Sequence, residues 1–543
     1  MDKQIGKKIW IDEKNIIYYN MKIVGICSGH DCSYAVLENG IPIIHNELER
    51  FIRQKEPIAD ALEFLFDTYD KLDDIKHISY CVNSWNGGIK ERYPDTYSKA
   101  LSIVEKNGGK FWPNNDTQPG HHQCHAANAF FSSNCKDALI VTIDGGGEDY
   151  YNGQHTYTAF TVWQGNDNKI HPLDIIPMDH FNIGRLWNHY TTQVFGLSGT
   201  GDEKGSQAGT VMGMAALGDE TRFRDTIMDK NRMIQLASES EQNRFDIAAA
   251  LQSFTEDEIR NKISYYLQKY PNKNLCLSGG VALNCVLVGK IKSWFPEIEN
   301  IYVDPVPSDA GIALGGPRYI WHHILDNPRI EWKDNATPYL GYEYHIDNLN
   351  EQLDKNKNVL EWETCNDDDV IELLTNQKII SICNKGSESG RRALGNRSIL
   401  ADPRSDKMKD LINDKVKHRQ WFRPFAPSIL REEVNNWFKQ DVNSPYMSFA
   451  IAFKDEMKDK VPAVVHFDGT ARLQTVSKND NEWYYNLIKK FKEKTGVPIL
   501  LNTSFNDREP IVETPEHAIN CFLGTDIDYL YFPEHKIICT KKK

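Results

Sequence analysis

Several features that would assign the sequence to a class of protein are missing from it. No apolar run among its 543 residues reaches the length of a membrane span, and the first residues contain no signal-peptide core. The 11 cysteines are odd in number and include no Cys-x-x-Cys pair, which fits free thiols better than a disulfide framework. We therefore expect a cytoplasmic protein that does not bind a membrane.

Positive charge is also in short supply. Lys and Arg number 63 against 76 Asp and Glu, and the formal net charge is −13. A general nucleic-acid binder needs a basic surface, so this balance predicts that nucleic acid is not a partner.

Apolar residues, by contrast, are plentiful. Hydrophobic residues make up 40% of the chain, with 12 Trp, 24 Tyr and 23 Phe, which excludes wholesale disorder. The length is too great for one compact core. Residues 1–20 are polar and are interpreted as an N-terminal extension, and residues 317–361 loosen into polar, Asn- and Asp-rich sequence. We therefore predict one domain over residues 21–350 and a second over residues 351–543.

Two histidines give the first indication of chemistry. His121 and His125 are four residues apart, so on a helix both imidazoles leave the same face and can bind one metal ion. Such a pair alone is more often found at a surface or in a core, and His122 could equally be a partner. The buried strand predicted at residues 138–143 ends in Asp144, which would bring a carboxylate to the same region.

Glycines follow Asp144 directly. Gly145 and Gly146 open a polar loop in which backbone N–H groups could approach phosphate oxygens. Together with the histidine pair, this pattern predicts a combined metal and nucleotide site.

The same plan of strand, polar loop and hairpin occurs twice. A strand over residues 22–27 precedes a hairpin centred on Asn39-Gly40, and the strand over residues 138–143 precedes a hairpin with its turn at residues 165–167. A repeated unit of this kind indicates an internal duplication. It predicts an α/β fold of the actin/hexokinase type, with two duplicated ribonuclease H-like halves.

A second glycine turn lies farther along the chain. Gly279 and Gly280 follow a short buried strand and lead into a helix near Asn284, where free N–H groups would face an anion or a nucleotide. Asp309 stands at another loop-to-helix junction. It is either a simple N-cap or the fourth ligand after His121, His125 and Asp144.

The charge balance reverses in the C-terminal part. Residues 385–423 hold eleven Lys and Arg against five Asp and Glu. A basic run is usually a solvated face, but here the arginines stand among glycines, prolines and apolar residues. This placement predicts partly buried guanidinium groups that face phosphate or carboxylate. The strand and polar turn over residues 497–506 are interpreted as part of a second anion site.

Taken together, these blocks resemble the O-carbamoyltransferase family of antibiotic and nodulation-factor biosynthesis over nearly all of residues 21–535. The most specific blocks are Gly29–Asp31, His121–His125, Ser278–Asn284, Arg392–Arg404, Arg423–Ser428 and Asn502–Asn506. The resemblance implies an N-terminal domain similar to the tRNA threonylcarbamoyl-transferase, with an actin-like fold, and a C-terminal α/β domain of the YrdC type.

The resemblance also implies a reaction in two stages. Carbamoyl phosphate and ATP give carbamoyl-adenylate and pyrophosphate in the C-terminal domain. The adenylate then reaches the metal site, where a substrate hydroxyl takes the carbamoyl group and AMP leaves. The partners implied are carbamoyl phosphate and a small hydroxylated acceptor such as a natural product or sugar, with a homodimer as one option for assembly.

Site residues carry over by position. The metal ligands implied are His121, His125, Asp144 and Asp309. The nucleotide-binding residues are Gly279, Gly280 and Asn284, beside the loop glycines Gly145 and Gly146. The residues that bind carbamoyl phosphate and ATP are Arg392, Lys417, Arg423, Arg472 and Ser504. His30 matches the residue beside the accepting hydroxyl, and either His30 or Asp31 could accept its proton.

The metal in the family is iron, and carboxylates mixed with imidazoles fit Fe(II). Ligand types alone allow Zn or Mn as well. ATP brings a need for Mg, so the expected cofactors are Fe(II), ATP and Mg.

Two positions depart from the family pattern. Thr210 stands where a lysine is usual, so one cation of the nucleotide cleft is missing. Arg391 stands where the family has proline, and it could compete with Arg392 for its role. Both departures concern efficiency or acceptor choice more than the reaction.

Two other functions are consistent with parts of the sequence. A tRNA-modifying carbamoyl-type transferase would require a sizeable basic surface, which this acidic chain does not obviously offer. An actin- or chaperone-like ATPase would leave the C-terminal arginines unexplained. The reaction products with ATP and carbamoyl phosphate distinguish transfer from ATPase activity.

Overall fold

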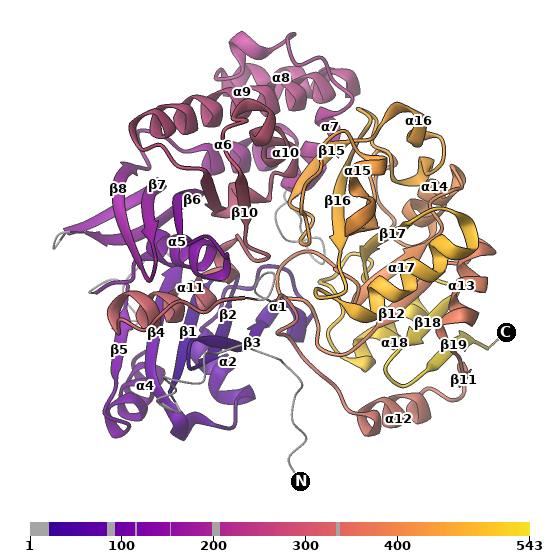
Figure 1. Cartoon of the computed structure of the whole chain (residues 1–543), viewed down its shortest axis with the longest axis horizontal. Coiled ribbons are helices and arrows are strands. Elements are labelled where there is room, and N and C mark those ends of the chain that lie inside the picture. Colours follow the sequence, from indigo (N-terminus) through magenta and orange to yellow (C-terminus); the bar gives the residue numbers. More distant parts are fainter. Residues whose placement is uncertain are drawn as a thin grey trace.

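The computed structural model describes residues 21–83, 93–114, 117–151, 154–197, 207–332 and 337–542. The predicted extension at residues 1–20 lies outside these ranges. In Figure 1 the N-terminal part, drawn indigo to magenta, carries two five-stranded sheets, and the C-terminal part, drawn orange to yellow, carries one nine-stranded sheet. The predicted α/β class is confirmed.

The first sheet has the order β3-β2-β1-β4-β5. Strands β1, β2 and β3 pair antiparallel, whereas β4 runs parallel to β1 and β5 runs parallel to β4. Its strands are β1 (Lys22–Gly29), β2 (Ser33–Glu38), β3 (Ile41–Glu47), β4 (Ile75–Asn83) and β5 (Lys110–Pro113).

The second sheet repeats this arrangement. Its order is β10-β9-β6-β7-β8, with β6, β7 and β8 antiparallel and with β9 and β10 parallel to β6. Its strands are β6 (Asp137–Tyr151), β7 (Gln154–Asn166), β8 (Lys169–Pro177), β9 (Asn274–Ser278) and β10 (Asn300–Val303). The internal duplication of the actin/hexokinase type is therefore present.

Two helices lie between these sheets. Helix α5 (His121–Ser132) packs on β6, helix α11 (Ile312–Tyr319) packs on β1, and the two helices pack on each other. They approach closely because α11 has Gly315 at the crossing, where an added Cβ would lie 1.9 Å from the Cys124 carbonyl oxygen. Every residue of α5 is buried, so its histidines point into the interior.

The remaining helices of the N-terminal part cover the outer faces. Helices α8 and α9 lie together at the top of Figure 1. The bounds are α1 (Leu48–Ile52), α2 (Ala61–Thr68), α4 (Pro94–Lys106), α6 (Ile183–His189), α7 (Ala208–Ala215), α8 (Lys230–Glu239), α9 (Glu241–Lys269) and α10 (Cys285–Trp294).

The C-terminal sheet is mixed, with the order β11-β19-β18-β12-β13-β17-β14-β16-β15. Its strands are β11 (Leu360–Thr364), β12 (Ile380–Cys383), β13 (Arg397–Ala401), β14 (Ala426–Leu430), β15 (Phe449–Ala452), β16 (Thr470–Val476), β17 (Ile499–Ser504), β18 (Tyr529–Phe532) and β19 (Ile537–Lys541). The helices are α12 (Ile346–Lys355), α13 (Asp367–Thr375), α14 (Lys407–Lys415), α15 (Val434–Trp437), α16 (Asp455–Lys458), α17 (Glu482–Thr495) and α18 (Pro515–Gly524). The division predicted at residues 350 and 351 falls inside α12, which packs on α18.

Two local predictions in the second half of the duplication were wrong. The segment Asp144–Gly147 is not a loop, because β6 continues through it as a bulge between Ile143 and Gly147. Glycine permits this bulge, and Gly146 has a φ of 135°. The turn of the following hairpin lies at residues 167–168 instead of 165–167, because Asn166 already pairs with Lys169.

Two expectations from composition can be compared with the fold. All eleven cysteines lie in the described ranges as free thiols, as predicted. Within the same ranges, none of the helices combines the length and the apolar character that crossing a bilayer requires.

Candidate active site

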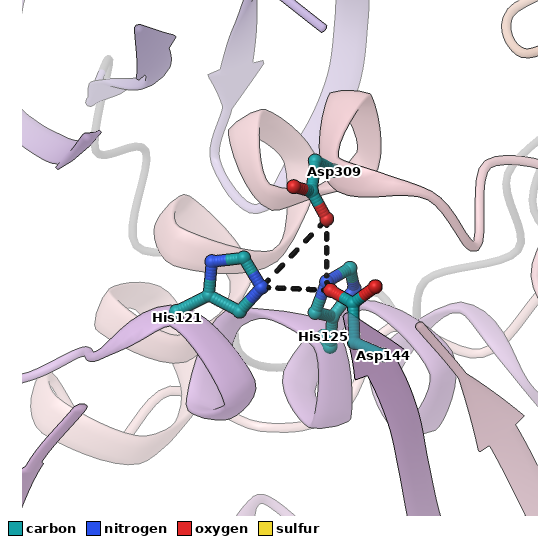
Figure 2. Close-up of side chains that lie close together, drawn as sticks. All are labelled: His121, His125, Asp144 and Asp309. Atoms are coloured by element: carbon teal, nitrogen blue, oxygen red, sulfur yellow. Dashed lines mark hydrogen bonds and ion pairs between the residues drawn. The ribbon is translucent and has the colours of Figure 1, made fainter. Parts of the chain in front are cut away.

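Four side chains that are far apart in sequence meet at the N-terminal end of α5. Figure 2 shows His121 and His125 from α5, Asp144 from β6, and Asp309 from the short helix η6 (Asp309–Gly311). His121 Nε2 lies 2.9 Å from Asp144 Oδ2, and His125 Nε2 lies 3.3 Å from the same oxygen. Asp309 Oδ1 lies 3.2 Å from His125 Nε2 and 3.7 Å from His121 Nε2. One donor atom from each residue falls within 4.8 Å of the others.

The backbone around this cluster fixes its side chains. The N–H groups of Gly145 and Gly280 donate to Asp144 Oδ1 at 2.7 and 3.3 Å, which leaves Oδ2 for the histidines. Gly147 makes room for an imidazole, because an added Cβ would lie 2.2 Å from the His121 Cγ. The bulge in β6 therefore brings a carboxylate and a histidine ring together.

The donor set suits a divalent cation. Burial by itself lowers the pKa of a histidine, yet Asp144 and Asp309 raise the pKa of His125 to about 9. Burial by itself raises the pKa of an aspartate, yet the two histidines hold the pKa of Asp144 well below its usual range. Two buried carboxylates that converge on two imidazole nitrogens form a site of two nitrogen and two oxygen donors, which fits Fe(II), Zn or Mn.

His122, the alternative partner, points elsewhere. Its Nδ1 lies 2.7 Å from Asp149 Oδ2 and 2.8 Å from the Thr158 hydroxyl, and both Asp149 and Thr158 are buried. His122 is therefore committed to a contact with the second sheet.

His30 and Asp31 lie beside this cluster, at the end of β1. His30 Nε2 is 3.6 Å from Asp309 Oδ2, and His30 Nδ1 is 3.8 Å from Asp31 Oδ2. Burial opposes protonation of His30, but Asp31 and Asp309 raise the pKa of His30 to about 10. Asp31 is also bound to Arg391, which holds the pKa of Asp31 far below its usual range against the opposite effect of burial.

The nucleotide-binding glycines divide into two groups. Gly145, Gly146 and Gly280 line the main cavity, whereas Gly279 is not among its lining residues. Gly279 has a φ of 89°, and an added Cβ there would lie 2.2 Å from the Ile143 carbonyl oxygen, so it supports the turn. Asn284 lines the cavity and also caps α10 through the N–H of Leu287.

Several cations gather on another wall of the same cavity, all of them from the C-terminal part. Burial and the neighbouring Arg472 lower the pKa of Arg392 to about 9 and that of Arg423 to about 10. None of these three arginines has an ion pair with a carboxylate in the part of the chain that the structure describes. Uncompensated guanidinium groups in a partly buried site are an anion-binding arrangement. We call Arg392, Arg419, Arg423 and Arg472 the arginine cluster.

Arg419 was missed by the sequence prediction. Burial, Arg423 and Arg472 lower the pKa of Arg419 well below its usual range. Its Nε donates to Asn413 Oδ1 at 2.8 Å, and its position two residues after Lys417 in the same basic run was the available signal.

Lys417 and Ser504 are brought together, but not as independent ligands. The Lys417 ammonium donates to the carbonyl oxygens of Ser504 and Asn506 at 2.6 and 2.8 Å, and to Asn506 Oδ1 at 2.6 Å. These bonds use the three N–H groups of the lysine. In this structure Lys417 therefore shapes the turn that presents the Ser504 hydroxyl.

One cavity of about 1840 Å³ joins the two groups of residues. Its walls include Asp144 and Asp309 from the metal-ligand cluster and all four residues of the arginine cluster. The two departures from the family pattern lie on it as well. Thr210 is buried on its wall, and Arg391 is bound to Asp31 and Glu56, which leaves Arg392 to face the arginine cluster.

Comparisons with known proteins agree with this geometry. Residues 221–317 match the family described as "Carbamoyltransferase N-terminus", and residues 371–538 match "Carbamoyltransferase C-terminus". Nodulation protein NolO of Bradyrhizobium diazoefficiens is 34% identical over 448 residues, which are 76% of this chain and 77% of that protein. The chain belongs to the carbamoyltransferase family.

Other relatives extend the match of this carbamoyltransferase. An uncharacterised protein of Synechocystis is 32% identical over 76% of this chain and 74% of its own length. An uncharacterised protein of Methanocaldococcus jannaschii is 28% identical over 95% of this chain and 99% of its own. Among solved structures, HypF of T. kodakarensis is similar over 56% of this chain and 48% of its own, at 13% identity and a TM-score of 0.38, which is too low to carry a functional argument.

Proposed function

We propose that this carbamoyltransferase is an ATP-dependent O-carbamoyltransferase that works in two steps. In the first, carbamoyl phosphate and ATP yield carbamoyl-adenylate. In the second, a hydroxyl of a small natural product or sugar takes the carbamoyl group and AMP leaves. One observation carries the proposal: a single cavity holds a cluster of arginines without carboxylate partners and a buried cluster of metal-ligand type.

Atom balance defines what the first step has to accomplish. Carbamoyl-adenylate keeps one phosphate, that of AMP, so the phosphate of carbamoyl phosphate leaves as inorganic phosphate when water attacks. The carbamate oxygen then forms a bond to the α-phosphorus of ATP, and the bond to pyrophosphate breaks. Every species in this sequence is anionic.

The arginine cluster is suited to that task. Four guanidinium groups can neutralise the phosphates of both substrates and hold them in line, which contributes more to such a displacement than a protein nucleophile does. Arg392, Arg423 and Arg472 would bind carbamoyl phosphate and ATP, and Lys417 would hold Ser504 towards them. Gly145, Gly146, Gly280 and Asn284 would face the nucleotide from the other wall.

The second step belongs to the metal-ligand cluster. His121, His125, Asp144 and Asp309 would hold a divalent ion, with Fe(II) as the proposed metal. When bound, the ion supplies a Lewis acid for a phosphate or carbamoyl oxygen. His30 lies beside Asp309, and neutralisation of that carboxylate by a cation would bring the pKa of His30 down towards the range in which it accepts the proton of the acceptor hydroxyl.

Product analysis tests the proposal. The full-length protein with ATP, Mg and carbamoyl phosphate is expected to form pyrophosphate and AMP, and a screen of hydroxylated metabolites should find one that gains the mass of a carbamoyl group. Formation of ADP and phosphate alone would instead indicate an ATPase and would overturn the proposal.

A further inference from the structure

Arg391 joins the two parts of the protein at the edge of the arginine cluster. Its Nη2 donates to Asp31 Oδ1 and its Nη1 to Glu56 Oε1, each at 2.6 Å. Asp31 follows β1 and Glu56 follows α1, so both carboxylates come from the N-terminal part. Both residues have left-handed backbone conformations, with φ of 56° and 47°. Such conformations persist where their surroundings hold them in place, as Arg391 does here.

The residue before Arg391 is held from the same side. The Gly390 N–H donates to Glu47 Oε1 at 2.7 Å, and its carbonyl oxygen accepts from Arg50 Nη2 at 2.5 Å. Gly390 has a φ of 85°, and an added Cβ there would lie 2.6 Å from the Pro305 carbonyl oxygen. Two consecutive residues of this C-terminal loop are therefore fixed by the N-terminal part.

The next residue is Arg392, which needs such support. It lies among arginines, and no carboxylate in the described residues pairs with it to offset their repulsion. Burial and Arg472 both disfavour its charge. A cation in such surroundings stays in place only if its backbone is held there, and the bonds of Gly390 and Arg391 supply that constraint.

We propose that Asp31 and Glu56 are positioning residues for the carbamoyl-phosphate site. Through Arg391 they hold the loop that presents Arg392, so the N-terminal part completes a site whose ligands come from the C-terminal part. The inference rests on the proposed function. It places Asp31 in the first step, whereas a role as proton acceptor for the hydroxyl would place it in the second.

Docking of the two parts does not depend on this contact alone. Arg50 Nη1 lies 3.3 Å from Glu513 Oε2, and Arg53 Nη1 donates to the Ile511 carbonyl oxygen at 2.8 Å. These bonds remain when Asp31 or Glu56 is changed. The variants therefore test the placement of Arg392 without separating the two parts.

The test is carbamoyl-phosphate-dependent exchange of labelled pyrophosphate into ATP, which needs no acceptor. Full-length Asp31→Asn, Glu56→Gln and Arg391→Gln are compared with wild type. Each is expected to raise the KM for carbamoyl phosphate about ten-fold, with the maximal exchange rate within about three-fold, because a charge-assisted contact that orients a ligand is lost. The double variant D31N/R391Q should be no worse than R391Q, and R391K should recover part of the loss.

Asp179→Asn is the matched control, since Asp179 lies on the same cavity wall in no contact with this loop that the structure shows. Its KM should equal that of wild type. A wild-type KM in D31N and E56Q would overturn the inference, as would an equal rise in D179N. If the wild-type protein shows no exchange at all, the proposed function itself fails, which is a different result. Should D31N fold poorly, E56Q and R391K decide.

Discussion

His125 shows how much one side chain can contribute to this site. It is fully buried, its Nε2 lies within 3.3 Å of two carboxylates, and it stands one helical turn from His121. A ring in that position either binds a cation together with its neighbours or carries a proton between two aspartates. The two possibilities differ in whether the protein retains metal.

Replacing His125 with alanine is expected to remove bound metal. One of four ligands is lost, so the metal content per chain, measured by plasma mass spectrometry after gel filtration, should fall close to zero. His155→Gln is the control, because His155 pairs with Glu148 outside the cluster. Full metal content in the His125 variant would contradict the ligand assignment.

Arg423 gives a second prediction at this scale. Removing one uncompensated guanidinium from the arginine cluster should slow pyrophosphate exchange by about 100-fold, the usual loss when one preorganised charge donor is deleted. Arg431→Ala serves as control, since Arg431 pairs with Asp441 at the surface. Exchange within a few-fold of wild type in Arg423→Ala would show that the arginine cluster does not bind the substrates.

Not every residue was predictable from sequence. The spacing of His121 and His125 is encoded locally by the helical repeat, and Asp144 by the strand that ends there. The partner of Arg391 is not, because Asp31 is 360 residues away and only the fold brings them together. The same holds for Lys417, whose role in the turn at Ser504 depends on contacts that no local pattern specifies.

At the scale of elements, the bulge in β6 matters most for the site. It was predicted as a loop because three glycines follow Asp144, and glycine runs usually indicate loops. The two flanking segments of β6 nevertheless both pair with β7, so the glycines are absorbed into the strand as a bulge. The hairpins were predictable because Asn39-Gly40 and the alternation of apolar residues act locally.

Gly147 tests the function of this bulge. Alanine there would place a Cβ 2.2 Å from the His121 ring, so the ring must move. We expect metal affinity, measured by competition with a chelator, to fall at least about ten-fold. Gly145→Ala is the control for metal binding, since nothing lies within 4 Å of an added Cβ. Unchanged affinity in Gly147→Ala would mean that His121 does not need its present position.

At the scale of the whole molecule, the two parts share one cavity of about 1840 Å³. Its arginine wall comes from the C-terminal part, and its metal-ligand wall comes from the N-terminal part. This division explains why one chain carries both: a reactive mixed anhydride made at one wall can be used at the other without passing through solvent. It also predicts that the two half-reactions can be separated experimentally.

The most direct test of that claim is pyrophosphate exchange before and after metal removal. The protein is treated with a chelator selective for transition metals, returned to Mg buffer, and assayed with ATP, labelled pyrophosphate and carbamoyl phosphate. If the arginine cluster forms the adenylate by itself, exchange persists at close to the original rate while transfer to an acceptor stops and returns on adding Fe(II). Loss of exchange together with transfer would contradict the account, because it would place both steps at one centre.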